Sequence, residues 1–150
     1  MQLDELYRQV IMDHYKTPRN RGMLDGEAVS VQLNNPTCGD RIELQMFIED
    51  GKVKQARFEG EGCSISMSSA SMMTDAIKGK TLEEALKLAE QFSQMMQGQE
   101  HEEFEYEDME ALSGVTKFPA RIKCATLAWN ALRKGIVQSK HELDGGSNES

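Results

Sequence analysis

The chain has 150 residues, 39% of them hydrophobic and 28% charged, which is typical of a single globular domain with its own hydrophobic core. Its net charge of −8 and pI near 4.9 argue against DNA, RNA or an anionic membrane surface as a partner, because those surfaces bind basic faces. The first twenty residues carry charged side chains throughout and no apolar run is long enough to span a bilayer, so we expect a cytoplasmic protein.

The first half of the chain is predicted to form one helix followed by three strands. Apolar side chains recur at helical spacing before Pro18, which ends the helix. Hydrophobic and polar residues then alternate as in half-buried strands, and Asp50-Gly51 between two alternating runs predicts a hairpin. The predicted bounds are 3–16 for the helix and 29–33, 42–48 and 53–58 for the strands.

The second half of the chain is predicted to be helical. Its first helix is rich in Ser and Ala, which indicates close packing against a neighbour, and Gly79 ends it. Thr81 and Glu84 form a capping box for the next helix, and Pro119 lies where the first turn of a last helix tolerates proline. The predicted bounds are 59–62 for a glycine-rich turn, 64–77 for the first helix and 99–110 for an acidic, solvated connector with one helical turn.

Strands followed by helices in one small chain predict an α+β fold, with an antiparallel sheet covered by helices. We expect a single domain over residues 1–138. The polar, glycine- and serine-containing end of the chain, residues 139–150, is predicted to be a disordered C-terminal tail.

The three cysteines are Cys38, Cys63 and Cys124. An odd number of cysteines in a reduced protein argues against a disulfide framework. Each cysteine falls in a predicted loop or at a predicted helix start, where free backbone N–H groups and the helix dipole favour the thiolate. The thiolate is both a nucleophile and a metal ligand, so the three segments are candidates for one site at an end of the sheet.

The sequence Cys38-Gly39-Asp40 adds a carboxylate to this candidate site, because a glycine between them leaves both side chains room to turn toward one ion. Three thiolates and a carboxylate fit a tetrahedral zinc shell, and they also fit an iron–sulfur cluster. Three unrelated cysteines remain the alternative, because this number is ordinary in 150 residues and spacings of this length are not diagnostic.

Four segments carry a resemblance to a known family: residues 6–15 (LYRQVIMDHY), 34–40 (NNPTCGD), 58–66 (FEGEGCSIS) and 118–127 (FPARIKCATL). They resemble the U-type iron–sulfur cluster assembly proteins, the IscU/SufU family with NifU N-terminal-like domains, and the resemblance runs from about residue 3 to about residue 137. The sequence is similar to the SufU branch rather than to the IscU scaffold branch. Its segment between Cys63 and Cys124 is longer, with the added element near 98–116, and Lys123 stands where the scaffold branch has a histidine. Protonated lysine has no lone pair for a metal.

The resemblance implies a SufE/NifU-like architecture, in which helices lie on one face of a three-stranded antiparallel sheet. It also implies zinc bound by Cys38, Asp40, Cys63 and Cys124. Cys38 is then the catalytic residue, which accepts persulfide sulfur from a SufS-type cysteine desulfurase after a desulfurase side chain replaces it on the zinc. The chain would be a zinc-dependent sulfurtransferase and not a hydrolase, and would serve the downstream iron–sulfur assembly machinery. The alternatives are a scaffold that assembles a [2Fe–2S] cluster on the same cysteines, and a purely structural zinc module.

Four further residues were considered as parts of the site. His14, His101 and His141 are remote in sequence from the thiols, and we expect none of them to be a ligand. Arg121 lies near Cys124 and is a candidate for supporting the metal site or docking a partner, with a solvated helix-start arginine as the alternative.

Overall fold

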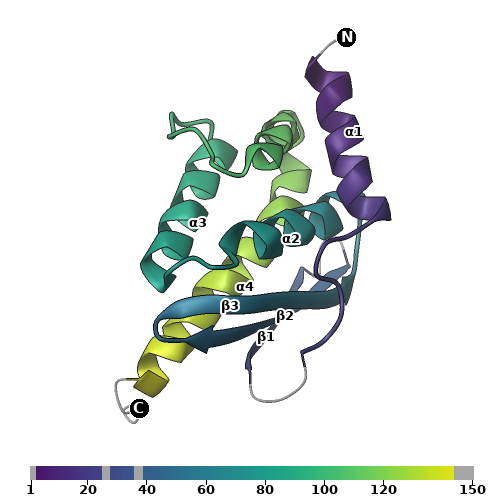
Figure 1. Cartoon of the computed structure of the whole chain (residues 1–150). Helices are drawn as coiled ribbons and strands as arrows, with labels where there is room; N and C mark the ends of the chain where they lie inside the picture. Colours follow the sequence, from purple (N-terminus) through teal and green to yellow (C-terminus); the bar gives the residue numbers. More distant parts are fainter. Residues whose placement is uncertain (1–2, 25–27, 36–38, 144–150) are drawn as a thin grey trace.

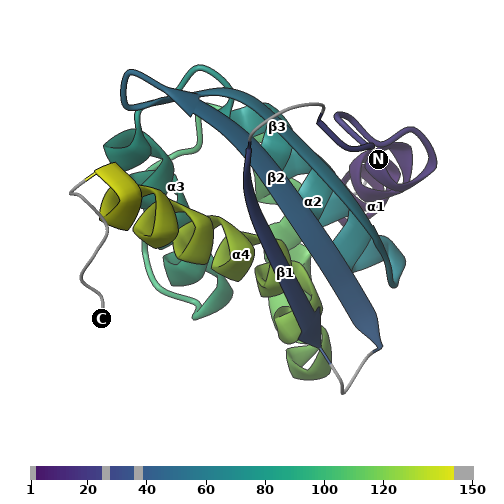
Figure 2. The ribbon, with the colours of Figure 1, turned by 90° about the horizontal axis from the view of Figure 1, so that it is seen from below.

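The computed structural model describes residues 3–24, 28–35 and 39–143, and it confirms the α+β fold class. Figures 1 and 2 show a three-stranded sheet with the helices on one of its faces. Among the described residues, no helix is long and apolar enough to cross a membrane. The elements in chain order are α1 (Leu3–Lys16), β1 (Val29–Asn35), β2 (Asp40–Glu49), β3 (Lys52–Glu61), α2 (Ser64–Ile77), α3 (Leu82–Met96), the 3-10 helix η1 (Glu107–Lys117) and α4 (Pro119–Leu143).

The sheet is antiparallel, as predicted, and its strand order is β1-β2-β3. Along β2, Ile42, Leu44 and Met46 are fully buried against the helices, while the residues between them are only half-buried. The turn between β2 and β3 places Asp50 and Gly51 at φ 56° and 73°, a left-handed pair that is typical of a tight hairpin. This local geometry fixes the register of the two longest strands.

Strand β3 is longer than the sequence predicted. The glycine-rich segment 59–62 was expected to be a turn, but β3 continues to Glu61, which pairs with Arg41 of β2. Gly60 lies at φ 153°, and a Cβ atom there would collide with the backbone carbonyl of Arg41. Glycine therefore permits close approach of two strands at this position, and it does not end the strand.

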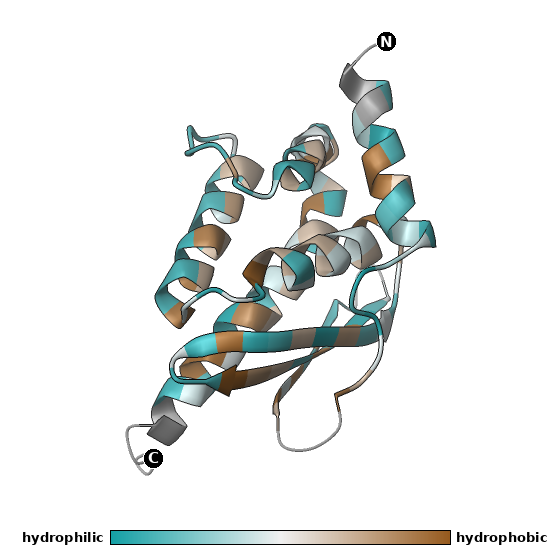
Figure 3. Ribbon diagram, in the orientation of Figure 1, coloured by the Kyte–Doolittle hydropathy of each residue, from teal (hydrophilic) through white to brown (hydrophobic). Residues whose placement is uncertain are grey.

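Helix α2 forms the centre of the helical layer, and its small residues allow α4 to approach closely. Ser69 Oγ donates a 2.6 Å hydrogen bond to the carbonyl of Ala125, and the indole N–H of Trp129 donates to the same serine oxygen. Trp129 also stacks on Phe92 of α3 with a centroid separation of 4.9 Å. Figure 3 shows hydrophobic residues gathered on the sides of α1 and α3 that face the other helices. The core lies between this layer and the sheet.

The connector after α3 is not fully solvated, contrary to the prediction for residues 99–110. Phe104 and Met109 are buried, and Met109 belongs to η1, which runs from Glu107 to Lys117. The segment is acidic only on its outer side, because its apolar residues recur at a spacing that lets them reach the core. The η1 element thereby fills the space between α1 and the start of α4 (Figure 1).

Helix α4 begins at Pro119, as predicted, and continues to Leu143. It therefore extends beyond residue 138, where the sequence placed the end of the domain. Residues 144–150 lie outside the described residues, so the disordered tail stays a prediction.

Candidate metal centre

Three elements bring polar side chains to one end of the sheet. Asp40 is the first residue of β2, and the pairing of Arg41 with Glu61 places the end of β3 beside it. Cys63 follows β3 directly as the N-cap residue of α2. Cys124 lies in the second turn of α4, which packs against α2. Segments far apart in the sequence thus meet where β3 passes into α2.

The ligand atoms of Asp40, Cys63 and Cys124 all lie within 4.8 Å of one another. Asp40 and Cys124 are buried, with exposed fractions of 1% and 0%, while Cys63 is half-buried. Cys63 is therefore the member of this group that solvent or another molecule reaches most easily. Neither Cys63 nor Cys124 forms a disulfide bond within the part of the chain that the structure describes.

The two carboxylate oxygens of Asp40 differ in their hydrogen bonding. The backbone N–H of Cys63 donates a 3.0 Å hydrogen bond to Asp40 Oδ1. Asp40 Oδ2 is buried and has no hydrogen-bond partner among the described residues. A buried oxygen without a partner costs free energy, so its position calls for a ligand.

Gly62 and Ser66 shape the space around Cys63. A Cβ atom on Gly62 would collide with Asp40 Oδ1 and would lie 2.5 Å from Ser66 Oγ, so only glycine fits between the carboxylate and α2. The Ser66 hydroxyl donates to the carbonyl of Cys63 and accepts a 3.8 Å hydrogen bond from its thiol. The sequence interpretation missed both residues; the glycine directly before Cys63 was the available signal.

This donor set fits a tetrahedral metal ion. Ligand atoms 2.0–2.3 Å from a tetrahedral zinc ion lie roughly 3.5 Å from one another, so small side-chain rotations bring atoms within 4.8 Å into such a shell. Thiolate sulfur is a preferred ligand of zinc and of iron–sulfur clusters, whereas magnesium and calcium prefer oxygen. Asp40 Oδ2, which has no hydrogen-bond partner among the described residues, would supply the third ligand.

The remaining candidate residues from the sequence are not part of this group of three ligand atoms. Cys38 lies outside the described residues, so its membership in the site stays a prediction. Lys123 and Arg121 are exposed at the start of α4. His101 contacts the carbonyl of Glu102 and is remote from the thiols in the sequence; the side chain of His141 is not among those described.

A second buried polar cluster surrounds His14, where α1 packs against α2. Its ring lies between Ser71 Oγ, 2.7 Å from Nδ1, and Asp108 Oδ2, 2.9 Å from Nε2. Ser71 Oγ also accepts a hydrogen bond from the backbone N–H of Arg19. The serine hydroxyl can then donate to Nδ1, which leaves the Nε2 proton for Asp108. His14 and Ser71 are both fully buried, so this serine–histidine–aspartate row is not open to a substrate.

The chain matches the model of the NifU-like N-terminal domain family over residues 6–143. It is 61% identical to the zinc-dependent sulfurtransferase SufU of Bacillus subtilis (strain 168), over 92% of this chain and 94% of that protein. It is also 54% identical to the iron–sulfur cluster assembly scaffold protein IscU of Streptococcus pyogenes serotype M1, over 91% of this chain and 86% of that protein.

A solved structure supports the fold independently of close sequence identity. The N-terminal part of a nitrogen-fixing NifU-like protein from Brucella abortus superimposes with a TM-score of 0.85 at 21% identity, covering 93% of this chain and 97% of that one. The three-stranded sheet with its helical layer is therefore an architecture that this neighbour shares.

Proposed function

The chain belongs to the NifU-like N-terminal domain family, and we propose that it is a zinc-dependent sulfurtransferase of iron–sulfur cluster assembly. The observation that carries the proposal is the group formed by Asp40, Cys63 and Cys124, whose ligand atoms converge while one buried carboxylate oxygen has no hydrogen-bond partner among the described residues. The name and the 61% identity of the Bacillus subtilis relative support the same function.

We propose that Cys38, Asp40, Cys63 and Cys124 bind the zinc ion. Cys38 is two residues before Asp40 in the sequence, and this short separation, at most about 7 Å of extended chain, supports its inclusion in the same site. When bound, zinc keeps the sulfurs deprotonated and electron-rich.

Cys38 is the proposed sulfur acceptor. Its thiolate attacks the outer sulfur of a persulfide on the desulfurase, which forms a persulfide on Cys38. The sulfur–sulfur bond of the donor breaks, and the desulfurase cysteine leaves as a thiolate. One thiolate is consumed and one is released, so the exchange needs no oxidant or reductant.

The proposed partner is a SufS-type cysteine desulfurase, and the sulfur then passes to the downstream iron–sulfur assembly machinery. A cytoplasmic location is part of the proposal, because free thiols and thiolate ligands persist in a reducing compartment. Four protein ligands on a tetrahedral ion leave no position for a water molecule, which argues against a zinc hydrolase.

A scaffold for a [2Fe–2S] cluster is the second candidate, and the name of the streptococcal relative favours it. The exposed Lys123 beside Cys124 weighs against it, because protonated lysine cannot serve as a ligand. Metal analysis of protein purified without air separates the two functions. One equivalent of zinc in a colourless protein supports the sulfurtransferase, and iron with sulfide in a brown protein supports the scaffold.

The acceptor role is tested by Cys38→Ala in an assay of cysteine-to-alanine turnover by a SufS-type desulfurase. We expect the wild type to raise the rate and the variant to give no stimulation, with an unchanged circular dichroism spectrum. Full stimulation by Cys38→Ala would exclude this cysteine as the acceptor. The matched control is Ser113→Ala, which makes a similarly small change on η1 and should stimulate normally.

A further inference from the structure

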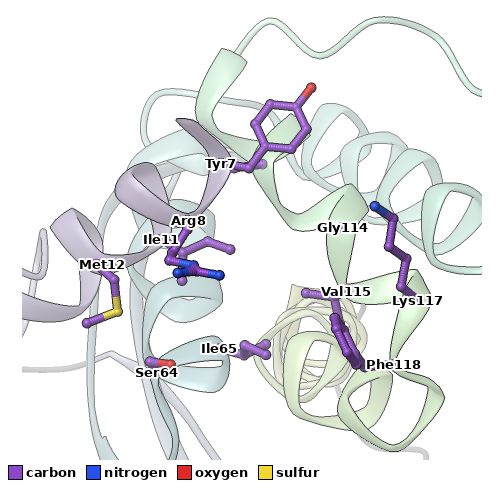
Figure 4. Close-up of a pocket in the computed structure, with 11 residues that line it drawn as sticks. Tyr7, Arg8, Ile11, Met12, Ser64, Ile65, Gly114, Val115, Lys117 and Phe118 are labelled. Carbon is purple, nitrogen blue, oxygen red and sulfur yellow. The ribbon is translucent and has the colours of Figure 1, made fainter. Parts of the chain in front are cut away.

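A pocket of about 340 Å³ opens between α1, the start of α2 and η1 (Figure 4). Ile11, Ile65 and Val115 converge in it from three different elements. Phe118, which is 61% exposed, lies at its edge between η1 and α4. Ser64 also lines the pocket and directly follows Cys63, so the pocket adjoins the candidate metal centre.

The charge of the pocket is opposite to that of the chain. The chain has 25 acidic and 17 basic residues, yet the eleven lining residues include the basic Arg8 and Lys117 and no acidic residue. Arg8 makes no hydrogen bond or ion pair with the part of the chain that the structure describes. A guanidinium group beside apolar side chains is suited to a carboxylate, which it binds through two parallel hydrogen bonds.

We propose that this pocket receives an acidic segment of the desulfurase, in which an apolar side chain fills the space between Ile11, Ile65 and Val115 while a neighbouring carboxylate binds Arg8. The inference rests on the proposed function, and it names the surface through which the partner docks.

Two observations identify the desulfurase as the occupant. A persulfide donor must approach the half-buried Cys63 end of the site, and a stable interface covers about 800 Å² on each partner. A surface of that size around Cys63 includes the pocket that begins at Ser64. The basic lining residues Arg8 and Lys117 also complement an acidic segment, and such charge complementarity steers association and adds specificity.

Arg8→Glu tests the proposal in a titration of the full-length protein into the desulfurase, with half-saturation and maximal stimulation measured separately. We expect the half-saturating concentration to rise about tenfold while the maximal rate is retained, because a docking residue acts on affinity and Cys38 acts on transfer. Arg8→Lys should recover part of the affinity. Lys54→Glu makes the same kind of charge reversal on the exposed surface of the β2–β3 hairpin and should shift half-saturation by less than twofold.

Further measurements on Arg8→Glu, and one additional variant, distinguish the outcomes. Zinc content and melting temperature should not change in Arg8→Glu, and raising the salt concentration should weaken the wild type more than this variant. Phe118→Ala should raise half-saturation several-fold without the change in salt dependence, because it removes apolar contact only. An unchanged half-saturation in Arg8→Glu, or an equal shift in Lys54→Glu, would overturn the proposal.

A second copy of the chain is the competing occupant of the pocket. A wild-type dimer in sedimentation that Arg8→Glu converts to a monomer would overturn docking of the desulfurase.

Calorimetric measurement of binding between this protein and the desulfurase separates this inference from the proposed function. Binding that depends on Arg8 without any stimulation leaves the docking surface standing and refutes the sulfurtransferase, whereas the absence of binding refutes the docking surface.

Discussion

Two buried polar clusters lie against α2, and they differ in how their hydrogen-bonding atoms are satisfied. In the cluster around His14, both ring nitrogens have partners, and Ser71 Oγ contacts both the ring and the backbone of Arg19. In the cluster around Asp40, one carboxylate oxygen accepts from Cys63 and the other, buried oxygen has no partner among the described residues. Among the described residues, the first cluster is fully hydrogen-bonded, whereas the second leaves one buried carboxylate oxygen for a ligand to satisfy.

Hydrogen-bond satisfaction distinguishes a structural polar cluster from a binding site. A buried polar group stabilises the fold only when its hydrogen bonds are made, and it costs free energy otherwise. The His14 cluster joins α1, α2 and η1, and Tyr106 extends it by donating to Asp75. Burial raises the pKa of Tyr106 above its ordinary value, with the hydrogen bond to Asp75 adding to the effect, so the phenol keeps its proton and remains a donor.

Removing the metal ion from the candidate metal centre should change stability more than any other substitution considered below. Cys124→Ser should abolish zinc binding and lower the free energy of unfolding of the zinc-loaded protein by about 4 kcal/mol, the stabilisation from an ion present at 1,000 times its dissociation constant. A chelator should lower the melting temperature of the wild type and leave this variant almost unchanged. A Cys124→Ser protein with one equivalent of zinc and wild-type melting would show that the cluster does not hold the metal.

The next largest effect is expected in the satisfied cluster. His14→Ala should destabilise the protein by about 2–4 kcal/mol, because it leaves a cavity and removes the ring that Ser71 and Asp108 both contact. Zinc content should remain at one equivalent. His101→Ala, on the half-exposed histidine of the connector, is the control and should change stability by less than about 0.5 kcal/mol. If His14→Ala lost zinc while its stability in urea was unchanged, the His14 cluster would have a role in metal binding and not the purely structural role assigned to it.

The elements that the sequence predicted correctly are those set by neighbouring residues. The left-handed pair Asp50-Gly51 makes the hairpin, and the reciprocal hydrogen bonds between Thr81 and Glu84 start α3. In that capping box, the hydrogen bond from the backbone N–H of Thr81 lowers the pKa of Glu84. Such signals lie within a few residues and need no knowledge of the fold.

The failures involve contacts between distant segments. The extension of β3 through Gly60 depends on the carbonyl of Arg41 across the sheet, and η1 is ordered because residues such as Met109 reach a core built by other elements. The candidate site was expected from family resemblance, because the spacing of Cys63 and Cys124 is not diagnostic. The lack of a partner for Asp40 Oδ2 among the described residues is a property of three-dimensional packing that residue patterns do not contain.

Asp40→Asn should change the free energy of unfolding only slightly in the metal-free protein, and in the opposite direction from its effect on the zinc-loaded protein. Asp40→Asn keeps the oxygen that accepts from Cys63 and replaces the partnerless oxygen by a neutral amide, which is less costly to bury than a charge. The metal-free variant should therefore be as stable as the metal-free wild type or more stable by about 1 kcal/mol, while the zinc-loaded form loses stability.

Asp108→Asn is the matched control in the satisfied cluster. It should lower stability by about 0.5–1 kcal/mol equally in both forms, since the Asp108 side chain is 42% exposed and its pairing with His14 is partly screened. Unfolding in urea with and without a chelator gives all four values, and a fall in the stability of metal-free Asp40→Asn would mean that the second oxygen of Asp40 already has a stabilising partner within the chain.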